Sequence, residues 1–238
     1  MDAHVSAAVA PVALSIVIPC LDEAQGIAAA LDALAPLRRR GTEVIVVDGG
    51  STDATPAIAA GRADLVLMSA RGRAVQMNAG AARARGDVLL FLHADTILPQ
   101  DADTLLRDAL AQSAASWGRF DVTIRGRHPL LRVIAAAMNL RSRWTGIATG
   151  DQAIFVSRRT FERAGGYPPI ALMEDVALSR TLRREGPPAC ISERPVTSGR
   201  RWEENGVVRT IILMWRLRLA YRLGADPDSL ALRYAARK

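Results

Sequence analysis

Short apolar runs alternate with alanine-rich stretches along the first hundred residues of the chain. The apolar runs, which we expect to be strands, cover residues 14–18, 43–47, 64–68 and 88–92. The stretches between them, which we expect to be helices, cover residues 23–40, 53–62 and 73–85. Strands that alternate with helices favour a parallel sheet, because parallel neighbours need a crossover connection. The pattern therefore predicts an α/β fold with a mainly parallel central sheet flanked by helices.

The alternation is less regular after residue 99. There we expect strands at 117–124 and 152–156 and helices at 101–113, 129–143, 158–164, 174–185, 202–223 and 228–237. No internal repeat or low-complexity linker marks a second domain, and the length suits one large domain. We therefore predict a leader over residues 1–12 and a single domain over 13–238, with a first half to about 98, a second half to about 200 and terminal helices from 202.

The charge of the chain bears on which classes of ligand or surface it can bind. The chain has 31 basic and 24 acidic residues, a net charge of +7, and Lys238 is its sole lysine. Arginine binds phosphate in a bidentate way, which suits a phosphate-bearing ligand or an anionic surface, although coding bias explains such a composition equally well. The arginines are spread along the chain without a basic-aromatic platform, so we expect no specific nucleic-acid binding.

Other features bear on compartment. Cys20 and Cys190 form neither a metal-binding pair nor a disulfide framework, so we expect reduced thiols in a cytoplasmic protein. Residues 1–12 lack the features of a signal peptide. The apolar segment 207–215 is interrupted by Arg209 and is shorter than the ~20 residues of a membrane span, so membrane contact would be peripheral.

Acidic and imidazole side chains stand where two of the expected strands end. Asp48 follows the run 44–47, and its carboxylate can either accept a hydrogen bond from a base or sugar or satisfy the turn amides beside Ser51. His93 and Asp95 follow the run 88–92 on the same side of an extended segment, a spacing that can share Mn²⁺ or Mg²⁺ with substrate phosphates. The alternative role for the Asp95 carboxylate is to cap the next turn. In open α/β sheets, ligands bind at the edge formed by the carboxyl ends of the strands.

Further candidates lie on loops and helix starts. Glu174 and Asp175 open a helix, where the helix dipole favours acids, but a carboxylate at the mouth of a cleft is also the ordinary general base for a hydroxyl. Arg71 and Arg73 precede a helix and suit either a phosphate site or a solvated basic face. We expect sugar or acceptor contacts from Trp144, Asp151, Gln152, Arg201 and Trp202.

Four motifs, taken together, resemble the family 2 glycosyltransferases over about residues 14–200. They are Ser15-Ile-Val-Ile-Pro19 with Glu23, Val46-Val-Asp-Gly-Gly-Ser-Thr-Asp53, Phe91-Leu-His-Ala-Asp95 and Met173-Glu-Asp-Val-Ala-Leu-Ser-Arg180. Each motif is weak alone, but the order and spacing of all four are specific. Shorter motifs are similar to those of a bacterial subgroup labelled as glycosyltransferases associated with arsenosugar biosynthesis. These motifs are Gln76-Met-Asn-Ala-Gly80, Gly150-Asp-Gln152 and Leu172-Met-Glu-Asp175.

The resemblance implies a GT-A fold, a nucleotide-sugar donor, often uridine-linked, and a single transfer with inversion at the anomeric carbon. It implies a nucleotide-sugar site made by the residues Pro19, Glu23, Asp48, Ser51, Arg71, Arg73, Ala94 and Asp95. Asp95, with His93, would hold Mn²⁺ or Mg²⁺ on the diphosphate. Asp175 would be the general base for an unidentified acceptor, with Glu174 beside it.

Three departures from the family pattern qualify this interpretation. His93 replaces the first acid of the usual Asp-x-Asp, and Gly49 replaces a second acid after Asp48. Ser198 stands at the glutamine position of the Gln-x-x-Arg-Trp motif of processive relatives.

Two other functions are alternatives to glycosyl transfer. One is a sugar-phosphate nucleotidyltransferase, for which the chain lacks a glycine-rich loop after its first strand. The other is a non-catalytic basic module that binds nucleic acid or a membrane surface.

Overall fold

The computed structural model describes residues 13–235, in ten strands, eleven α-helices and one 3₁₀ turn. The expected leader 1–12 and the end of the expected helix 228–237 lie outside the described residues. The strands are β1 Leu14–Cys20, β2 Glu43–Asp48, β3 Leu65–Met68, β4 Val88–Phe91, β5 Thr96–Ile97, β6 Trp117–Phe120, β7 Thr123–Arg125, β8 Phe155–Ser157, β9 Ala189–Ile191 and β10 Val196–Ser198. The helices are α1 Ile27–Ala33, α2 Ala35–Arg39, α3 Thr55–Ala59, α4 Arg73–Arg83, α5 Ala102–Gln112, α6 Leu130–Thr145, α7 Arg158–Arg163, α8 Glu174–Leu182, α9 Arg200–Glu204, α10 Val207–Arg222 and α11 Pro227–Ala235, with the 3₁₀ turn η1 at Gly150–Gln152.

A seven-stranded sheet in the order β3-β2-β1-β4-β8-β6-β9 forms the centre of the molecule. β1 pairs in parallel with β2 and β4, and β2 with β3, as the alternating pattern predicts. β8 is antiparallel to both of its neighbours, so the sheet is mixed in its second half. The carboxyl ends of β1, β2 and β4 therefore meet at one edge, where the polar turns after these strands lie.

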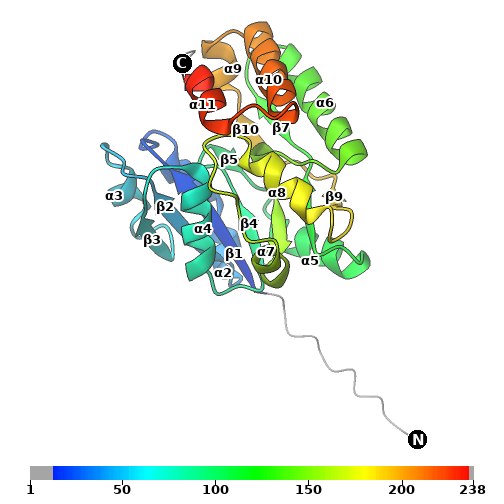
Figure 1. Cartoon of the computed structure of the whole chain (residues 1–238). Coiled ribbons are helices and arrows are strands. Elements are labelled where there is room, and N and C mark those ends of the chain that lie inside the picture. Colours follow the sequence, from blue (N-terminus) through cyan, green and yellow to red (C-terminus); the bar gives the residue numbers. More distant parts are fainter. Residues whose placement is uncertain (1–12, 236–238) are drawn as a thin grey trace, which may run out of the picture.

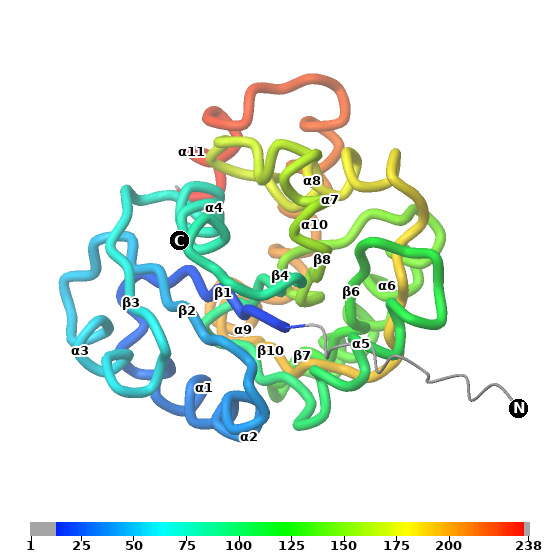
Figure 2. The backbone as a smooth tube through the Cα atoms, turned by 90° about the horizontal axis from the view of Figure 1, so that it is seen from below, coloured from blue at the N-terminus to red at the C-terminus, as the bar shows by residue number. Residues whose placement is uncertain are grey.

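Helices cover both faces of this sheet (Figure 2). On one face, α1, α2 and α5 pack on alternate side chains of the central strands, among them Ile16, Val46 and Leu90. On the other face, α4, α7 and α8 pack on the intervening residues, such as Val17 and Ile45. This alternation explains why the strands are continuous apolar runs: both of their faces are buried.

A smaller layer lies beyond the carboxyl edge of the sheet, at the top of Figure 1. It contains the three-stranded sheet β5-β10-β7 and the helices α9, α10 and α11. α10 packs against α6 through Val207 and Ile211, and against α8 and α11 through Leu217. The layer thus covers the edge at which the polar turns end. Within residues 13–235, no helix is long and apolar enough to cross a bilayer.

The expected strand 117–124 is wrong as a single element. It divides into β6, which pairs with β8 and β9, and β7, which pairs with β10 in the second sheet. The buried side chain of Asn139 accepts a hydrogen bond from the Val122 N–H at 2.9 Å and donates to the Val122 carbonyl at 3.1 Å. Because an α6 side chain takes both backbone groups of Val122, the chain leaves one sheet there and enters the other.

Two long expected helices are also interrupted. The segment 23–40 forms α1 and α2, with a break at Leu34 before Pro36, a residue that favours the first turn of a helix. The segment 202–223 forms α9 and α10, separated at Gly206, whose φ of 80° lies in the left-handed region. The expected strand 152–156 begins only at Phe155, because Gly150–Gln152 is a 3₁₀ turn.

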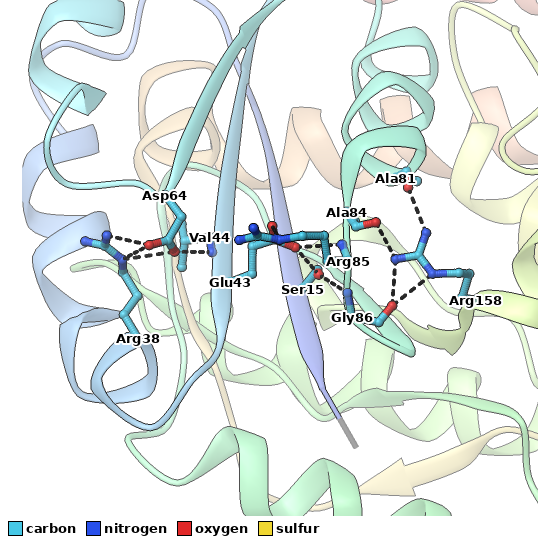
Figure 3. Close-up of polar contacts among 10 residues, drawn as sticks. All are labelled: Ser15, Arg38, Glu43, Val44, Asp64, Ala81, Ala84, Arg85, Gly86 and Arg158. Carbon is cyan, nitrogen blue, oxygen red and sulfur yellow. Dashed lines mark hydrogen bonds and ion pairs between the residues drawn. The ribbon is translucent and has the colours of Figure 1, made fainter. Parts of the chain in front are cut away.

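A polar network fixes the opposite edge of the sheet, at the amino ends of the strands (Figure 3). The Ser15 hydroxyl donates to Glu43 at 2.6 Å and accepts from the Gly86 N–H at 2.8 Å, so it joins β1 to β2 and to the turn before β4. The guanidinium of Arg158 donates to the carbonyls of Gly86 and Ala84 at 2.7 and 2.6 Å. These contacts fix the register of the strands whose other ends carry the candidate site.

Candidate functional site

A cavity of about 650 Å³ lies at the carboxyl edge of the central sheet, under the C-terminal helices. Most residues expected at the site line it: Pro19, Glu23, Arg73, His93, Asp95, Asp151, Glu174, Asp175, Arg201 and Trp202. They come from the end of β1 and the turn after it, the turn after β4, the start of α4, η1, the start of α8, and α9. The fold therefore brings together residues as far apart in the sequence as Pro19 and Trp202.

Asp48 does not line this cavity. Its carboxylate is fully buried and accepts hydrogen bonds from the N–H groups of Gly50 and Ser51 at 2.9 and 2.8 Å, and from the Ser51 hydroxyl. The sequence left two roles for Asp48, contact with a base or sugar and stabilisation of the turn amides, and these hydrogen bonds stabilise the turn. Ser51 and Ala94 are likewise outside the cavity lining, and Ala94 packs in the core. A role of Asp48 in reading the base stays a prediction.

The arginines before α4 have different positions. Arg71 is exposed and does not line the cavity, whereas Arg73 lines it and lies 3.3 Å from Glu174, measured between Nη1 and Oε1. Gln76, one turn further, donates from Nε2 to the carbonyls of Cys20 and Val47 at 2.8 Å each. α4 therefore ties the ends of β1 and β2 together while it presents Arg73 to the cavity.

His93 has a different partner from the expected one. Its Nδ1 lies 3.2 Å from the Asp151 carboxylate, and its buried Nε2 has no hydrogen-bond partner among the described residues. Gly150 presses on that side of the ring, since a Cβ at this position would lie 2.3 Å from Nε2. The imidazole thus contacts η1 through Asp151 and Gly150, and Asp95 is the exposed side chain at this strand end. Metal binding by His93 stays a prediction. The hydrogen bond and charge of His93 lower the pKa of Asp151, although burial acts in the opposite direction.

Asp95 and Glu23 form the acidic end of the cavity. Burial and the charge of Asp95 raise the pKa of Glu23, while Arg200 and Arg201 act to lower it. A divalent cation would relieve the repulsion between the two carboxylates, and Mg²⁺ usually takes one or two protein carboxylates plus phosphate oxygens. Residues 13–235 contain no cluster of three or more His, Cys, Asp or Glu that could hold a metal ion. A single carboxylate such as Asp95 suits a cation that also takes phosphate oxygens of a ligand.

Glu174 and Asp175 begin α8 directly after Met173, whose φ of 71° is unusual for a non-glycine residue. Asp175 accepts from the Gly150 N–H at 2.9 Å and from the Val176 N–H at 2.7 Å, so its carboxylate is fixed at the cavity wall. Glu174 is only 3% exposed. Burial and the charge of Asp175 raise the pKa of Glu174, which Arg73 partly offsets.

Two expected contact residues are not at the cavity. Trp144, at the end of α6, is 80% exposed and lies outside the lining, because its helix turns this side chain to solvent. Gln152 is fully buried; its Oε1 accepts from the Thr149 N–H at 3.3 Å, so it stabilises η1 from beneath. Arg201 and Trp202 do line the cavity, and the Arg201 guanidinium contacts the ring of Tyr234 on α11.

Sequence reasoning missed one wall of the cavity. α10 contributes Thr210, Met214 and Arg218, which lie one turn apart on the same face of the helix, and α11 contributes Tyr234. The four-residue spacing was visible in the sequence, but it equally describes an ordinary core face. Only the docking of α10 over the sheet edge distinguishes the two.

Comparison with known proteins gives the family. The glycosyl transferase family 2 profile matches residues 15–166. The PGL/p-HBAD biosynthesis glycosyltransferase of Mycobacterium tuberculosis is 33% identical in an alignment 173 residues long that covers 64% of this chain and 62% of that protein. The chain thus spans less than two thirds of the length of these curated relatives.

Solved structures agree on the fold. S. aureus TarS 1–349 in complex with UDP-GlcNAc superposes with a TM-score of 0.64 at 16% identity, over 78% of this chain and 58% of that chain. The mannosyltransferase PcManGT from Pyrobaculum calidifontis, in complex with GDP-Man and Mn²⁺, gives 0.61 at 22% identity, over 90% of this chain and 66% of that chain. The architecture is the expected GT-A fold. The chain belongs to glycosyl transferase family 2.

Proposed function

We propose that this protein transfers one sugar from a nucleotide diphosphate sugar, uridine-linked, to the hydroxyl of an acceptor with inversion. One observation carries the proposal: Asp95 and Asp175, from distant segments, line the same cavity. Asp95 suits a cation on a diphosphate, and Asp175 suits a base for the incoming hydroxyl. Nucleotide-sugar complexes of similar folds, with UDP-GlcNAc and with GDP-Man and Mn²⁺, support the donor class. Family membership favours glycosyl transfer over nucleotidyl transfer.

The charges of the cavity suggest how the two substrates are divided. The donor diphosphate would lie at the end formed by Glu23, Asp95, Arg200 and Arg201, where basic side chains and one exposed carboxylate meet. The acceptor would lie toward Asp175. Mn²⁺ or Mg²⁺, when bound at Asp95, would neutralise charge on the leaving diphosphate.

The proposed base is held by backbone groups. Two N–H donors fix the orientation of Asp175, and they leave lone pairs of its carboxylate for the proton of the acceptor hydroxyl. Glu174, tied to Arg73, would hold that arginine and the start of α8 in place without contacting the reacting atoms. The His93–Asp151 contact would keep η1, and hence the Gly150 N–H, in register with Asp175.

A thermal-shift screen of nucleotide sugars, with and without Mn²⁺, tests this function. Donor binding stabilises a folded protein by mass action, so we expect a metal-dependent rise in Tm with a uridine diphosphate sugar. Asp95→Ala should abolish the metal-dependent part of that rise. Asp101→Ala, which removes a nearby exposed carboxylate outside the cavity, is the matched control. An equal response of wild type and Asp95→Ala would contradict the metal role.

We also propose that the outer face of α10 rests on an anionic bilayer surface. Five apolar side chains form an exposed stripe along this helix, at 52–78% exposure: Val208, Ile212, Trp215, Leu219 and Leu223. Exposed arginines flank the stripe, and α10 contains no acidic residue. An apolar stripe with a tryptophan and flanking arginines is typical of interfacial helices.

The family and the fold do not identify the subgroup, the acceptor or the compartment. Membership of the arsenosugar-associated subgroup, the acceptor and the cytoplasmic location therefore stay proposals.

Vesicle flotation tests the membrane contact. The wild-type protein should float with phosphatidylglycerol vesicles at low salt, and Trp215→Ser with Leu219→Ser should reduce the floated fraction. Val133→Ser, an exposed apolar residue on α6, is the control. A protein that stays in the unbound fraction would contradict the membrane contact. A concentration-dependent dimer that the double variant abolishes would instead assign the stripe to an interface with a second copy of the chain.

A further inference from the structure

Two half-buried arginines near Asp175 have guanidinium nitrogens without a hydrogen-bond partner among residues 13–235. Arg141 belongs to α6 and Arg218 to α10, and Arg218 lines the cavity wall. Nε and Nη2 of Arg141 and Nε of Arg218 are buried without a hydrogen-bond partner in the part of the chain that the structure describes. Buried polar atoms are nearly always bonded, so three unbonded guanidinium nitrogens in adjacent side chains call for a missing acceptor.

Other arginines of the fold have carboxylate partners, although Nε of Arg119 is also buried without a hydrogen bond among the described residues. Arg119 is fully buried and pairs with Asp121, and Arg143 donates to the same carboxylate at 2.9 Å. Arg73 pairs with Glu174. Arg141 and Arg218 form no ion pair with the carboxylates of residues 13–235 and lie close enough to repel each other.

The electrostatics of the pair are unfavourable without a ligand. Burial, and then the charge of Arg218, lower the pKa of Arg141 to about 10; burial also lowers the pKa of Arg218. The negative charge of Asp175 partly compensates both arginines, and that of Asp151 also acts on Arg218, but neither carboxylate forms an ion pair with them among residues 13–235. Bringing two like charges out of water destabilises a fold unless an opposite charge is bound between them.

We propose that Arg141 and Arg218 bind an anionic group of the acceptor, a phosphate or a carboxylate, beside the base Asp175. This proposal rests on the proposed function, since it places the acceptor at Asp175. The planar, multi-donor guanidinium is suited to phosphate and carboxylate oxygens. The donor diphosphate has other cations, Arg200 and Arg201, beside Glu23. The acceptor would thus be a small hydroxyl compound with an anionic substituent near the hydroxyl that attacks.

A phosphate titration with the donor site filled tests the proposal. Wild-type protein saturated with UDP and Mg²⁺ is titrated with inorganic phosphate, and Tm is followed. We expect a phosphate-dependent rise in Tm, and a loss of about tenfold or more in apparent phosphate affinity for Arg141→Gln and for Arg218→Gln. Arg132→Gln, an exposed position on α6, is the control and should respond as wild type. Arg218→Lys, which retains the charge without the planar fork, should respond partially.

The variants should also be at least as thermostable as wild type without phosphate, because each removes half of a repelling pair. Should Arg218→Gln fold poorly, Arg218→Lys and Arg141→Gln provide the same comparison. No phosphate response in the wild type, or an unchanged response in both glutamine variants, overturns the proposal. Loss of the UDP response with a retained phosphate response assigns the arginines to the donor diphosphate and also overturns it. A wild-type protein without any nucleotide-sugar response refutes the proposed transferase function instead.

Discussion

The polar groups near the two ends of the central strands differ in whether the protein itself supplies their hydrogen-bond partners. At the amino ends, Ser15, Glu43 and Arg158 bond to one another's strands and turns, and the atoms that join the strands are paired within the protein (Figure 3). At the carboxyl ends, Asp95 is exposed in the cavity and guanidinium nitrogens of Arg141 and Arg218 have no partner among the described residues.

The difference separates polar groups that hold the fold from polar groups kept for a ligand. An unpaired buried polar group costs about 1–3 kcal/mol, so a fold retains several of them only where something else repays that cost. The amino-end network gains its stability from within the chain. The carboxyl-end groups would gain theirs from substrate, which predicts that substitutions at the two ends affect different measurements.

The largest effect is expected from Asp175→Asn. An asparagine keeps the size and one of the two hydrogen bonds from the Gly150 and Val176 N–H groups, because they donate to different oxygens, and it cannot take a proton; kcat for sugar transfer should fall by about 10²–10⁴-fold. The lost hydrogen bond should lower Tm slightly, while the shift of Tm with a uridine diphosphate sugar should stay unchanged. A variant with a normal kcat would show that another group is the base.

Ser15→Ala should produce the converse result at the other end. It leaves the buried Gly86 N–H without an acceptor and should lower the free energy of unfolding by about 1–3 kcal/mol. The affinity for a nucleotide sugar should not change in the folded protein. Ser113→Ala, on an exposed helix end, serves as the control in chemical denaturation. A loss of donor affinity with normal stability would break the distinction between the two ends.

The smallest effects concern pH. Loss of hydration favours the protonated form of Asp64, but hydrogen bonds from Arg38 and the Val44 N–H outweigh it and lower the pKa below 3.8. Asp64 thus contributes stability above pH 3.8 that is lost as the pH falls through its folded value. Burial and Asp175 raise the pKa of Glu174 above 4.5, so the ionised carboxylate reduces stability as the pH rises through its raised value.

Unfolding curves across pH 2–8 of Asp64→Asn and Glu174→Gln test these opposite signs. The deficit of Asp64→Asn relative to wild type should shrink in acid. Glu174→Gln should gain on wild type as the pH rises above 4.5. If both differences moved in the same direction with pH, the electrostatic contrast between the two ends would be refuted.

Much of this architecture follows from local pattern. Continuous apolar runs predict β1, β2 and β4, because strands buried on both faces have no polar side. The run of β3 predicts a strand as well, although at the sheet edge its side chains are half-buried or exposed. The polar turns that follow are then placed at one edge by parallel geometry alone. This places Asp95 at the cavity, whereas Asp175 reaches the cavity from the start of α8, and Asp48, at an equivalent strand end, is enclosed by its own turn.

The sequence by itself determined the order of strands and helices and which acids stand at the strand ends, since these depend on periodicities of two and 3.6 residues. Tertiary structure alone decided where Asn139 splits a strand, that Trp144 faces solvent, and that Arg141 meets Arg218. The physical reason is that these outcomes depend on contacts between α6, α10 and the sheet edge. Such contacts are long-range, and no local pattern encodes which face of a helix another segment will cover.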